Sequence, residues 1–405
     1  MKYILSFVLP LILTLNYGFC NFKIAYDESK ISTNTDCYVD DSGVDLNITS
    51  KSAVLIEAKS GKVLYEKNPN DKLKPASVTK IMTLLLCYDQ IKSGNMNYDD
   101  TITISEHAAS MGGSQCFFEA GEQQTVFDII KCIEISSGND AAVAMGEHIA
   151  GSEEEFVKLM NSKAKELGMN DTNFENACGL DSDNHYTSAY DIGIMSRELI
   201  TKHPEIFEIS TIWMDHIIHK TSKGESRFDL ANTNKFLRQY TGANGLKTGY
   251  TSDAGYCMSG TATRDDITLI AVVMGAETKE IRNEEVGKLL DFGFSKCTVY
   301  TDDNVLDNTN SVPVKNGVKK YVTPQKINEH TITLVDADIS NIKKDILLYD
   351  NLKAPIREGD IIGLVKYTHN NEIIDEIHIY SSENILKKSY SLSIRDLCNR
   401  FFVVE

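Results

Sequence analysis

Residues 74–86 read Lys74-Pro75-Ala76-Ser77-Val78-Thr79-Lys80-Ile81-Met82-Thr83-Leu84-Leu85-Leu86, and this stretch decides the fold. Pro75 favours the start of a helix, because its constrained φ suits the first turn and its missing N–H is not needed there. The residues after Lys80 are apolar on nearly every side of such a helix, which is typical of a helix buried in a core. The stretch therefore predicts a buried helix over residues 76–93 with a serine at its N-terminus.

Ser77 and Lys80 would lie on one face of that helix, about one turn apart. A hydroxyl beside an amine, at a helix N-terminus and with an apolar wall behind it, suits nucleophilic catalysis. The amine can accept the hydroxyl proton if burial lowers its pKa, and the helix dipole favours the negative charge that develops. The pattern S-x-x-K also arises often by chance, as an N-terminal serine followed by a solvated lysine, so other motifs must decide.

Length and composition set broad limits. The chain has 405 residues, more than one ordinary domain needs, and its hydrophobic fraction of 42% is normal for a protein with a sizeable core. Its formal net charge of −17 and its pI near 5.0 disfavour nucleic-acid binding as a main role. No Cys-x-x-Cys pair or histidine cluster suggests a metal site, and the sequence predicts neither a metal nor a cofactor.

Residues 1–20 are predicted to be a signal peptide for Sec-type export. Lys2 is a short positive region, and residues 3–15 are an apolar run interrupted by Pro10. Gly18-Phe19-Cys20 then offers small residues at the cleavage positions. The apolar run is shorter than the roughly 20 residues that a transmembrane anchor needs. The bulky Phe19 disfavours a lipoprotein site at Cys20.

Eight cysteines lie beyond the signal segment: Cys37, Cys87, Cys116, Cys132, Cys178, Cys257, Cys297 and Cys398. An even number in an exported protein permits disulfides, but the scattered positions argue against a dense disulfide framework. Three of them lie in apolar periodic segments and are predicted to be small core residues: Cys87, Cys132 and Cys257.

Residues 21–297 are predicted to form one α+β domain, with an antiparallel sheet, helices and a helical subdomain. Two pairs of β-prone runs around short turns predict hairpins, at 53–66 and 256–275. Apolar periodicity predicts helices that begin near residues 125, 140, 152, 188 and 278, and Ser152 with Glu155 forms a capping box. Because strands open and close the segment and helices lie between them, the terminal strands are expected to share one antiparallel sheet.

From residue 298 the helical periodicity disappears and short β runs alternate with turns. This pattern predicts a small all-β domain over residues 298–384, entered through a linker at 301–310 that is rich in Asp and Asn. Residues 385–405 then place apolar side chains on one helical stripe and basic ones off it, which predicts an amphipathic helix. Such a helix either anchors the chain at a membrane surface or docks on the β domain, and the basic flanks favour the anchor.

Two further motifs bear on the serine and lysine pair. Ser137-Gly138-Asn139 lies in a junction between two predicted helices, where side chains can project into a cleft. Lys247-Thr248-Gly249 lies on a predicted strand, where the lysine supplies positive potential and the threonine can offer a hydroxyl to a carboxylate. The glycine lets a substrate backbone approach the strand. Each motif alone is weak, but the ordered triple has the parts of an acyl-transfer site.

The three motifs resemble the S-x-x-K, S-x-N and K-T-G set of the active-site serine penicillin-recognising enzymes. More narrowly, the chain resembles the low-molecular-weight penicillin-binding proteins that are D-alanyl-D-alanine carboxypeptidases. Four stretches carry this likeness: Pro75-Ala76-Ser77, Ser137-Gly138-Asn139-Asp140-Ala141, Cys178-Gly179-Leu180-Asp181 with His185-Tyr186, and Gly245-Leu246-Lys247-Thr248-Gly249-Tyr250-Thr251 with Ala254-Gly255-Tyr256. The resemblance covers residues 50–293 well and the rest more loosely. It implies a β-lactamase/transpeptidase-like catalytic domain at 21–297, with the terminal helix as membrane anchor.

The resemblance also implies a reaction. Ser77 would attack the carbonyl between the two terminal D-alanines of a peptidoglycan stem peptide, with Lys80 as general base. Ser137 with Lys247 would relay a proton to the departing D-alanine, and the backbone N–H groups of Ser77 and Tyr250 would form the oxyanion hole. Water would then cleave the acyl-enzyme, and β-lactam antibiotics would trap it. Such an enzyme would act in cell-wall remodelling, at the outer face of the cytoplasmic membrane.

Substrate binding follows from the same resemblance. Asn139 would bind the substrate amide, while Lys247, Thr248 and Gly249 would hold the end that bears the terminal carboxylate. Some relatives carry an arginine upstream of K-T-G that helps to grip this carboxylate. Here the corresponding stretch reads Asn232-Thr233-Asn234, with threonine in that place, so carboxylate recognition is weaker or rests more on Lys247.

The nearest alternative is a class A-like β-lactamase. Its deacylating glutamate stands in an E-x-x-L-N pattern, and Glu166-Leu167-Gly168-Met169-Asn170 is close to it. We interpret this stretch instead as a helix end, because Gly168 can terminate the helix that begins at Ser152. Glu166 is then a solvated residue of the last turn, and the extra β domain and terminal helix also disfavour a β-lactamase.

Two further alternatives remain open from the sequence. The chain could be a non-catalytic penicillin-binding wall protein, although the intact motif residues argue against a dead site. It could also be an endopeptidase that cuts D-alanyl cross-links. A triad built on His185 and Tyr186 is disfavoured, because Lys80 already fills the role of the base.

Overall fold

The fold is given by a computed structural model, which describes residues 46–306, 311–389 and 394. The predicted signal peptide at 1–20 lies outside these residues. Most of the predicted terminal helix, 390–393 and 395–405, lies outside them as well.

A five-stranded antiparallel sheet forms the centre of the first domain, in the order β2-β1-β9-β8-β7. Its strands are β1 (Ser52–Glu57), β2 (Val63–Lys67), β7 (Ala243–Thr251), β8 (Gly255–Arg264) and β9 (Ile267–Ala276). Both predicted hairpins are present, and β1 pairs directly with β9. The first and last strands of the domain therefore share one sheet, and the predicted α+β class is confirmed.

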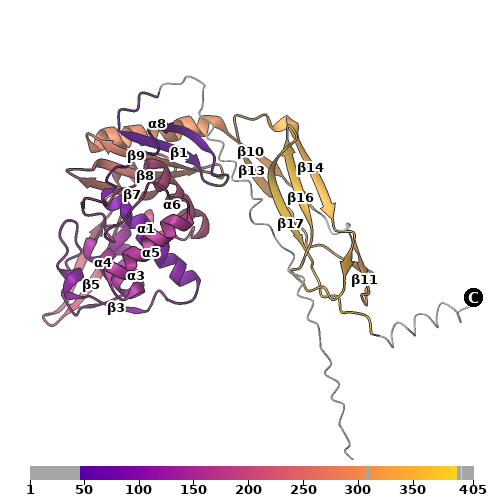
Figure 1. The fold of residues 1–405 in the computed structure, drawn as a ribbon, viewed down its shortest axis with the longest axis horizontal. Helices are drawn as coiled ribbons and strands as arrows, with labels where there is room; N and C mark the ends of the chain where they lie inside the picture. The colour runs from indigo at the N-terminus through magenta and orange to yellow at the C-terminus, as the bar shows by residue number, and fades with distance from the viewer. Residues whose placement is uncertain (1–45, 307–310, 390–393, 395–405) are drawn as a thin grey trace, which may run out of the picture. The chain divides into compact units, whose positions relative to one another are not determined.

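The sheet is buried on both faces, and side chains alternate between two apolar cores. On β1, Val54 and Ile56 contact the core on the helical side, whereas Ala53 and Leu55 contact the opposite core. This alternation follows from the two-residue period of a strand. Figure 1 shows α8 (Lys279–Lys296) along one face of the sheet and the group of helices along the other.

The helical side contains seven α-helices within the described residues. These are α1 (Lys80–Lys92), α2 (Glu106–Ala109), α3 (Val126–Glu134), α4 (Asn139–Ala150), α5 (Glu153–Glu166), α6 (Ala189–Lys202) and α7 (Ile206–Ser210). Every residue of α1 from Lys80 to Tyr88 is buried, as the apolar run predicts. The three cysteines predicted to be core residues are buried too.

Helix boundaries follow the predicted capping signals. The Ser152 hydroxyl accepts a hydrogen bond of 3.2 Å from the Glu155 N–H at the start of α5. This helix ends at Glu166, which is paired with Lys163 at 3.0 Å and is largely exposed, and Gly168 follows with φ of +75°. The interpretation of this stretch as a helix end is confirmed, so Glu166 is no counterpart of a deacylating glutamate.

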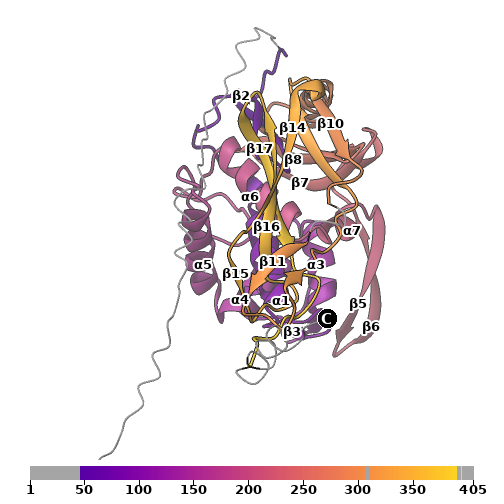
Figure 2. The same cartoon turned by 90° about the vertical axis from the view of Figure 1, so that its right-hand side faces the viewer.

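Shorter elements border the helical side. The strands β3 (Thr101–Thr103) and β4 (Gln123–Thr125) form a small pair, and β5 (Met214–Thr221) with β6 (Gly224–Ala231) forms a two-stranded ribbon (Figure 2). A short helical turn, η3 (Lys235–Arg238), leads from the ribbon to β7.

Residues 297–388 form a separate, all-β part with its own apolar core. Its elements are β10 (Cys297–Asp302), β11 (Val312–Lys315), β12 (Tyr321–Val322), β13 (His330–Val335), η4 (Ile339–Asn341), β14 (Ile342–Leu348), β15 (Leu352–Lys353), β16 (Ile361–His369) and β17 (Glu372–Tyr380). The sequence did not predict β10 and β11, nor the two-residue β15. The first begins at the end of α8 and extends into the predicted linker, while the second is four residues long and contains Pro313, which weakens a strand signal.

The start of the predicted terminal helix is wrong. Ile385 is buried and exchanges two backbone hydrogen bonds with Ile356, and Lys388 donates one to the Asn316 carbonyl. Residues 385–388 are therefore extended and belong to the β part, because Ile385 fills its core. Within residues 46–306 and 311–389, no helix is long and apolar enough to cross a bilayer.

A loop at residues 171–187 packs against the turn that precedes α1. This turn, η2 (Ala76–Thr79), carries Ser77. Gly179 has φ of +90°, and a Cβ at this position would lie 1.8 Å from the Ala76 carbonyl oxygen. Only glycine permits this approach.

The glycine requirement can be tested by substitution. Gly179→Ala should lower the free energy of unfolding by about 3 kcal/mol or more, because backbone strain of ~1–2 kcal/mol adds to a steric clash. Gly168→Ala is the matched control, since Gly168 also has a positive φ but no atom within 4 Å of its Cβ position. It should show only the strain of ~1–2 kcal/mol. Equal losses in denaturant unfolding would contradict the close contact.

Candidate active site

The amine of Lys80 is the centre of the site. Lys80 is fully buried, and its Nζ lies 2.9 Å from Ser77 Oγ, 2.6 Å from Asn139 Oδ1 and 2.8 Å from the Cys178 carbonyl oxygen. The amide and carbonyl oxygens can only accept hydrogen bonds. A neutral amine would give them its two N–H groups, and its lone pair would then face the Ser77 hydroxyl.

Burial sets the protonation of this amine. It lowers the pKa of Lys80 from 10.5 to about 7, and the nearby charge of Lys247 acts in the same direction. None of the three polar neighbours of Nζ carries a charge that would favour the ammonium form. A large fraction of Lys80 is therefore neutral at neutral pH, as a general base requires.

Ser77 is held on a strained turn. Ala76, the residue before it, has φ of +49°, a conformation that costs an alanine ~1–2 kcal/mol. Strand β7 lies directly against this turn, and a Cβ on Gly249 would meet the Pro75 carbonyl oxygen at 2.9 Å and the Ser77 nitrogen at 3.0 Å. The glycine of K-T-G thus allows the strand to reach the serine turn, which differs from the role expected for it.

Ser137 and Asn139 lie where α3 gives way to α4. Ser137 also has a positive φ, +60°, and Asn139 is the first residue of α4. The Asn139 side chain contacts the protein at both ends, since its Nδ2 donates to the Gly112 carbonyl at 2.6 Å while its Oδ1 faces Lys80. Asn139 thus orients the Lys80 amine, and its binding of the substrate amide stays a prediction.

Strand β7 supplies the opposite wall of the site. Lys247 is buried and its Nζ has no hydrogen-bond partner in the described part of the chain, while Thr248 Oγ1 donates to Thr233 Oγ1 at 3.2 Å. Tyr250 is exposed and stacks on Tyr256 with ring centroids 4.3 Å apart. All the residues predicted for the site thus come together at one end of the sheet.

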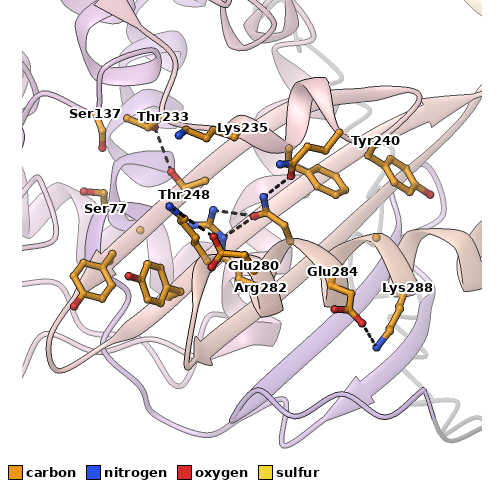
Figure 3. Close-up of a pocket in the computed structure, with 18 of the residues that line it drawn as sticks. Ser77, Ser137, Thr233, Lys235, Tyr240, Thr248, Glu280, Arg282, Glu284 and Lys288 are labelled. Atoms are coloured by element: carbon orange, nitrogen blue, oxygen red, sulfur yellow. Dashed lines mark hydrogen bonds and ion pairs between the residues drawn. The ribbon is translucent and has the colours of Figure 1, made fainter.

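These walls enclose a cleft of about 940 Å³. Ser77, Ser137 and Thr248 line one end of it, and Figure 3 shows their side chains gathered there. The cleft continues past Thr233 along η3 and the exposed side of α8. Its mouth is therefore open to a chain longer than a single amino acid.

The sequence reasoning missed Arg282, which lies on α8 and lines the cleft. It is buried, and its Nε and Nη2 donate to Asn283 Oδ1 at 3.1 and 2.9 Å. Burial lowers the pKa of Arg282 to about 10, so it remains a cation at neutral pH. No local pattern marks this arginine, because only the packing of α8 on the sheet brings it near Thr248.

A second missed residue is Glu134, the last residue of α3. It is buried, and burial raises the pKa of its carboxyl while the charge of Lys247 acts in the opposite direction. A glutamate at the end of the apolar stripe of α3 was the signal available in the sequence.

His185 does not contact Ser77. Its Nε2 lies 2.9 Å from Thr79 Oγ1 and its Nδ1 accepts from the Glu175 N–H. Burial lowers the pKa of His185 to about 4, so the ring is neutral. The histidine supports the turn from behind, which agrees with the preference for Lys80 over a histidine-based triad.

Comparisons with known proteins agree with this geometry. Residues 39–278 match the D-alanyl-D-alanine carboxypeptidase family, and residues 294–387 match the C-terminal domain of penicillin-binding protein 5. The chain is 44% identical to the D-alanyl-D-alanine carboxypeptidase DacF of Bacillus subtilis over 84% of its own length and 87% of that protein. It is 32% identical to DacC of Escherichia coli, over 84% and 85% of the two chains.

Solved structures give the same result. Penicillin-binding protein 5 of Haemophilus influenzae superposes with a TM-score of 0.64 at 32% identity, covering 84% of this chain and 98% of that one. Penicillin-binding protein 6B of Escherichia coli gives 0.63 at 29% identity, over 84% and 98% of the two chains. With its S-x-x-K, S-x-N and K-T-G residues assembled around one buried lysine, the chain belongs to the D-alanyl-D-alanine carboxypeptidase family.

Proposed function

We propose that the protein is a serine-type D-Ala-D-Ala carboxypeptidase, which removes the terminal D-alanine from peptidoglycan pentapeptide stems through an acyl-enzyme on Ser77. One observation carries this proposal: the buried amine of Lys80 lies 2.9 Å from Ser77 Oγ, with its other polar neighbours restricted to acceptors. β-Lactams acylate the same serine.

Acylation begins when Lys80 takes the proton of Ser77 and the serine oxygen bonds to the carbonyl carbon between the two D-alanines. The backbone N–H groups of Ser77 and Tyr250 stabilise the resulting oxyanion, and such donors are worth ~3–4 kcal/mol each. When the C–N bond breaks, Ser137 gives its proton to the departing nitrogen and recovers one from Lys247. Water then attacks the ester and releases the shortened stem.

The cationic residues of the cleft account for carboxylate recognition without an arginine at position 233. Thr233 and Thr248 offer hydroxyls at the same place, and Arg282 brings a guanidinium to that end of the cleft from α8. Together with Lys247, these groups bind the carboxylate of the terminal D-alanine. Carboxylate binding thus depends on two cations from different elements.

The identity of the nucleophile is tested by Ser77→Ala. This variant should release no D-alanine from a pentapeptide and form no penicillin adduct in mass spectrometry, because the bond-forming oxygen is gone. Ser93→Ala, at the far end of α1, is the matched control and should keep both activities. A penicillin adduct on the Ser77→Ala protein would move the nucleophile elsewhere.

The protonation of Lys80 is tested by the pH dependence of penicillin acylation, measured by stopped flow. Because neutral Lys80 is the base and its pKa is about 7, the rate should rise with pH through that value. Below it the rate should fall about tenfold per pH unit. An acidic limb centred near the ordinary lysine pKa of ~10 would show that burial does not neutralise the amine.

We further propose that the chain is exported and held at the outer face of the cytoplasmic membrane by its last residues. The apolar stripe at residues 390–405 with basic side chains off it supports this proposal. The enzyme would then work on peptidoglycan close to the membrane surface.

The anchor is tested by cell fractionation. Leu397→Asp combined with Phe401→Asp should move the protein from the membrane fraction to the soluble one, because both charges fall on the apolar stripe. Asn399→Asp adds a charge off the stripe and should leave the distribution unchanged. Removal of residues 390–405 should release the protein while leaving penicillin acylation intact. Membrane association that survives this deletion would rule out the anchor.

A further inference from the structure

Glu134 is the last residue of α3 and lies three residues before Ser137 in the chain. It precedes the turn that carries Ser137, and the Ile135 carbonyl within that turn accepts a hydrogen bond of 3.0 Å from the Thr233 N–H. The Thr233 hydroxyl in turn accepts a hydrogen bond from the Thr248 hydroxyl on β7. The end of α3 and the K-T-G strand are therefore tied together through one residue.

Three buried polar atoms, on residues that form this junction or adjoin it in sequence, have no hydrogen-bond partner in the described part of the chain. Within the described residues, six buried side-chain atoms lack such a partner, and half of them are Glu134 Oε2, Ser137 Oγ and Lys247 Nζ. Buried polar groups are nearly always paired, so a concentration of exceptions marks a functional cluster. Glu134 is 2% exposed and Lys247 is 1% exposed, and neither can be neutralised by bulk solvent.

The charges around Lys247 oppose one another. Burial lowers the pKa of Lys247, and Arg282 of α8 lowers it further, whereas the carboxylate of Glu134 raises it. Lys247 in turn lowers the pKa of Lys80 on α1. Glu134 also raises the pKa of Tyr88, which lies on α1. Burial raises the pKa of Glu134 to about 7, so above that pH its carboxylate offsets the positive charge of Lys247.

We propose that Glu134 is a positioning residue for the reaction: its carboxylate holds the proton on Lys247, so that Ser137 is served by an ammonium group when the substrate arrives. The inference rests on the proposed function, because it assigns Lys247 the task of resupplying Ser137. Without the Glu134 carboxylate, Lys247 would be buried near the Arg282 cation and its pKa would fall.

The protons balance over acylation. Lys80 gains one proton from Ser77, Ser137 passes one to the leaving nitrogen, and Lys247 replaces it on Ser137. The proton on Lys80 then passes to Lys247. The acyl-enzyme and the departed D-alanine together therefore carry the same total charge as the free enzyme and its substrate. Glu134 takes no part in these transfers and acts only through its charge.

The test is the pH profile of penicillin acylation for Glu134→Gln in the full chain. The alkaline limb, which reports loss of the proton from Lys247, should move to lower pH by about one unit and reduce the rate on that limb about tenfold. The acidic limb should move to higher pH, because a neutral Lys247 no longer lowers the pKa of Lys80. The bell-shaped curve of acylation rate against pH should therefore narrow from both sides.

Two variants separate charge from packing. Glu134→Asp keeps the carboxylate and should keep the wild-type alkaline limb. Glu285→Gln removes another buried carboxylate, which binds Thr49 and Ser50, and should lower the melting temperature without moving either limb.

Unchanged limbs in Glu134→Gln, or an equal shift in Glu134→Asp, would overturn the proposal. Failure of the wild-type protein to release D-alanine from a pentapeptide would instead refute the proposed function, and the two failures are thereby distinct.

Discussion

A lysine can accept a proton near neutral pH only if burial of its amine outweighs the effect of nearby anions, and Lys80 meets this condition, because burial lowers its pKa to about 7 although Asp140 acts in the opposite direction. Its Nζ has three polar neighbours, and none of them is charged. Burial supplies most of the reduction in pKa, and the positive charge of Lys247 adds to it. The same burial would destabilise any salt bridge, so the site orients its base with neutral acceptors. The proposed catalysis at Ser77 depends on this arrangement, which is present before any substrate is bound.

The arrangement needs backbone from three distant parts of the chain. The turn before α1 provides the serine, the start of α4 provides Asn139, and the loop at 171–187 provides the Cys178 carbonyl. Each part contains a residue with positive φ close to the lysine: Ala76, Ser137 and Gly179. Such conformations persist only where the surrounding packing enforces them. The apolar core around α1 therefore holds the strained turns as well as burying the base.

Local signals predicted much of this fold and site. The capping box at Ser152, the two hairpins and the apolar run of α1 act over a few residues, so the sequence shows them directly. The S-x-x-K and K-T-G residues were identified for the same reason. What escaped prediction depends on tertiary contacts: Arg282 enters the cleft only through the packing of α8, and Asn139 turns towards Lys80 only because Gly112 fixes its other end. The sequence places residue 385 in a helix because the apolar stripe that begins at Leu386 fits one, yet Ile385 is part of the β core.

The net charge of the chain is a poor guide to the potential inside this cleft. The protein carries a formal charge of −17, yet Lys80, Lys247 and Arg282 are all buried at its active end. Cations grouped in a dry site attract a carboxylate strongly, since little water screens them. They also repel one another, and each then tends to lose its proton. The proposed role of Glu134 is to limit that repulsion at Lys247. Substrate binding and proton transfer, as proposed, both need Lys247 to carry its proton, and the proposed role of Glu134 is to keep that proton in place.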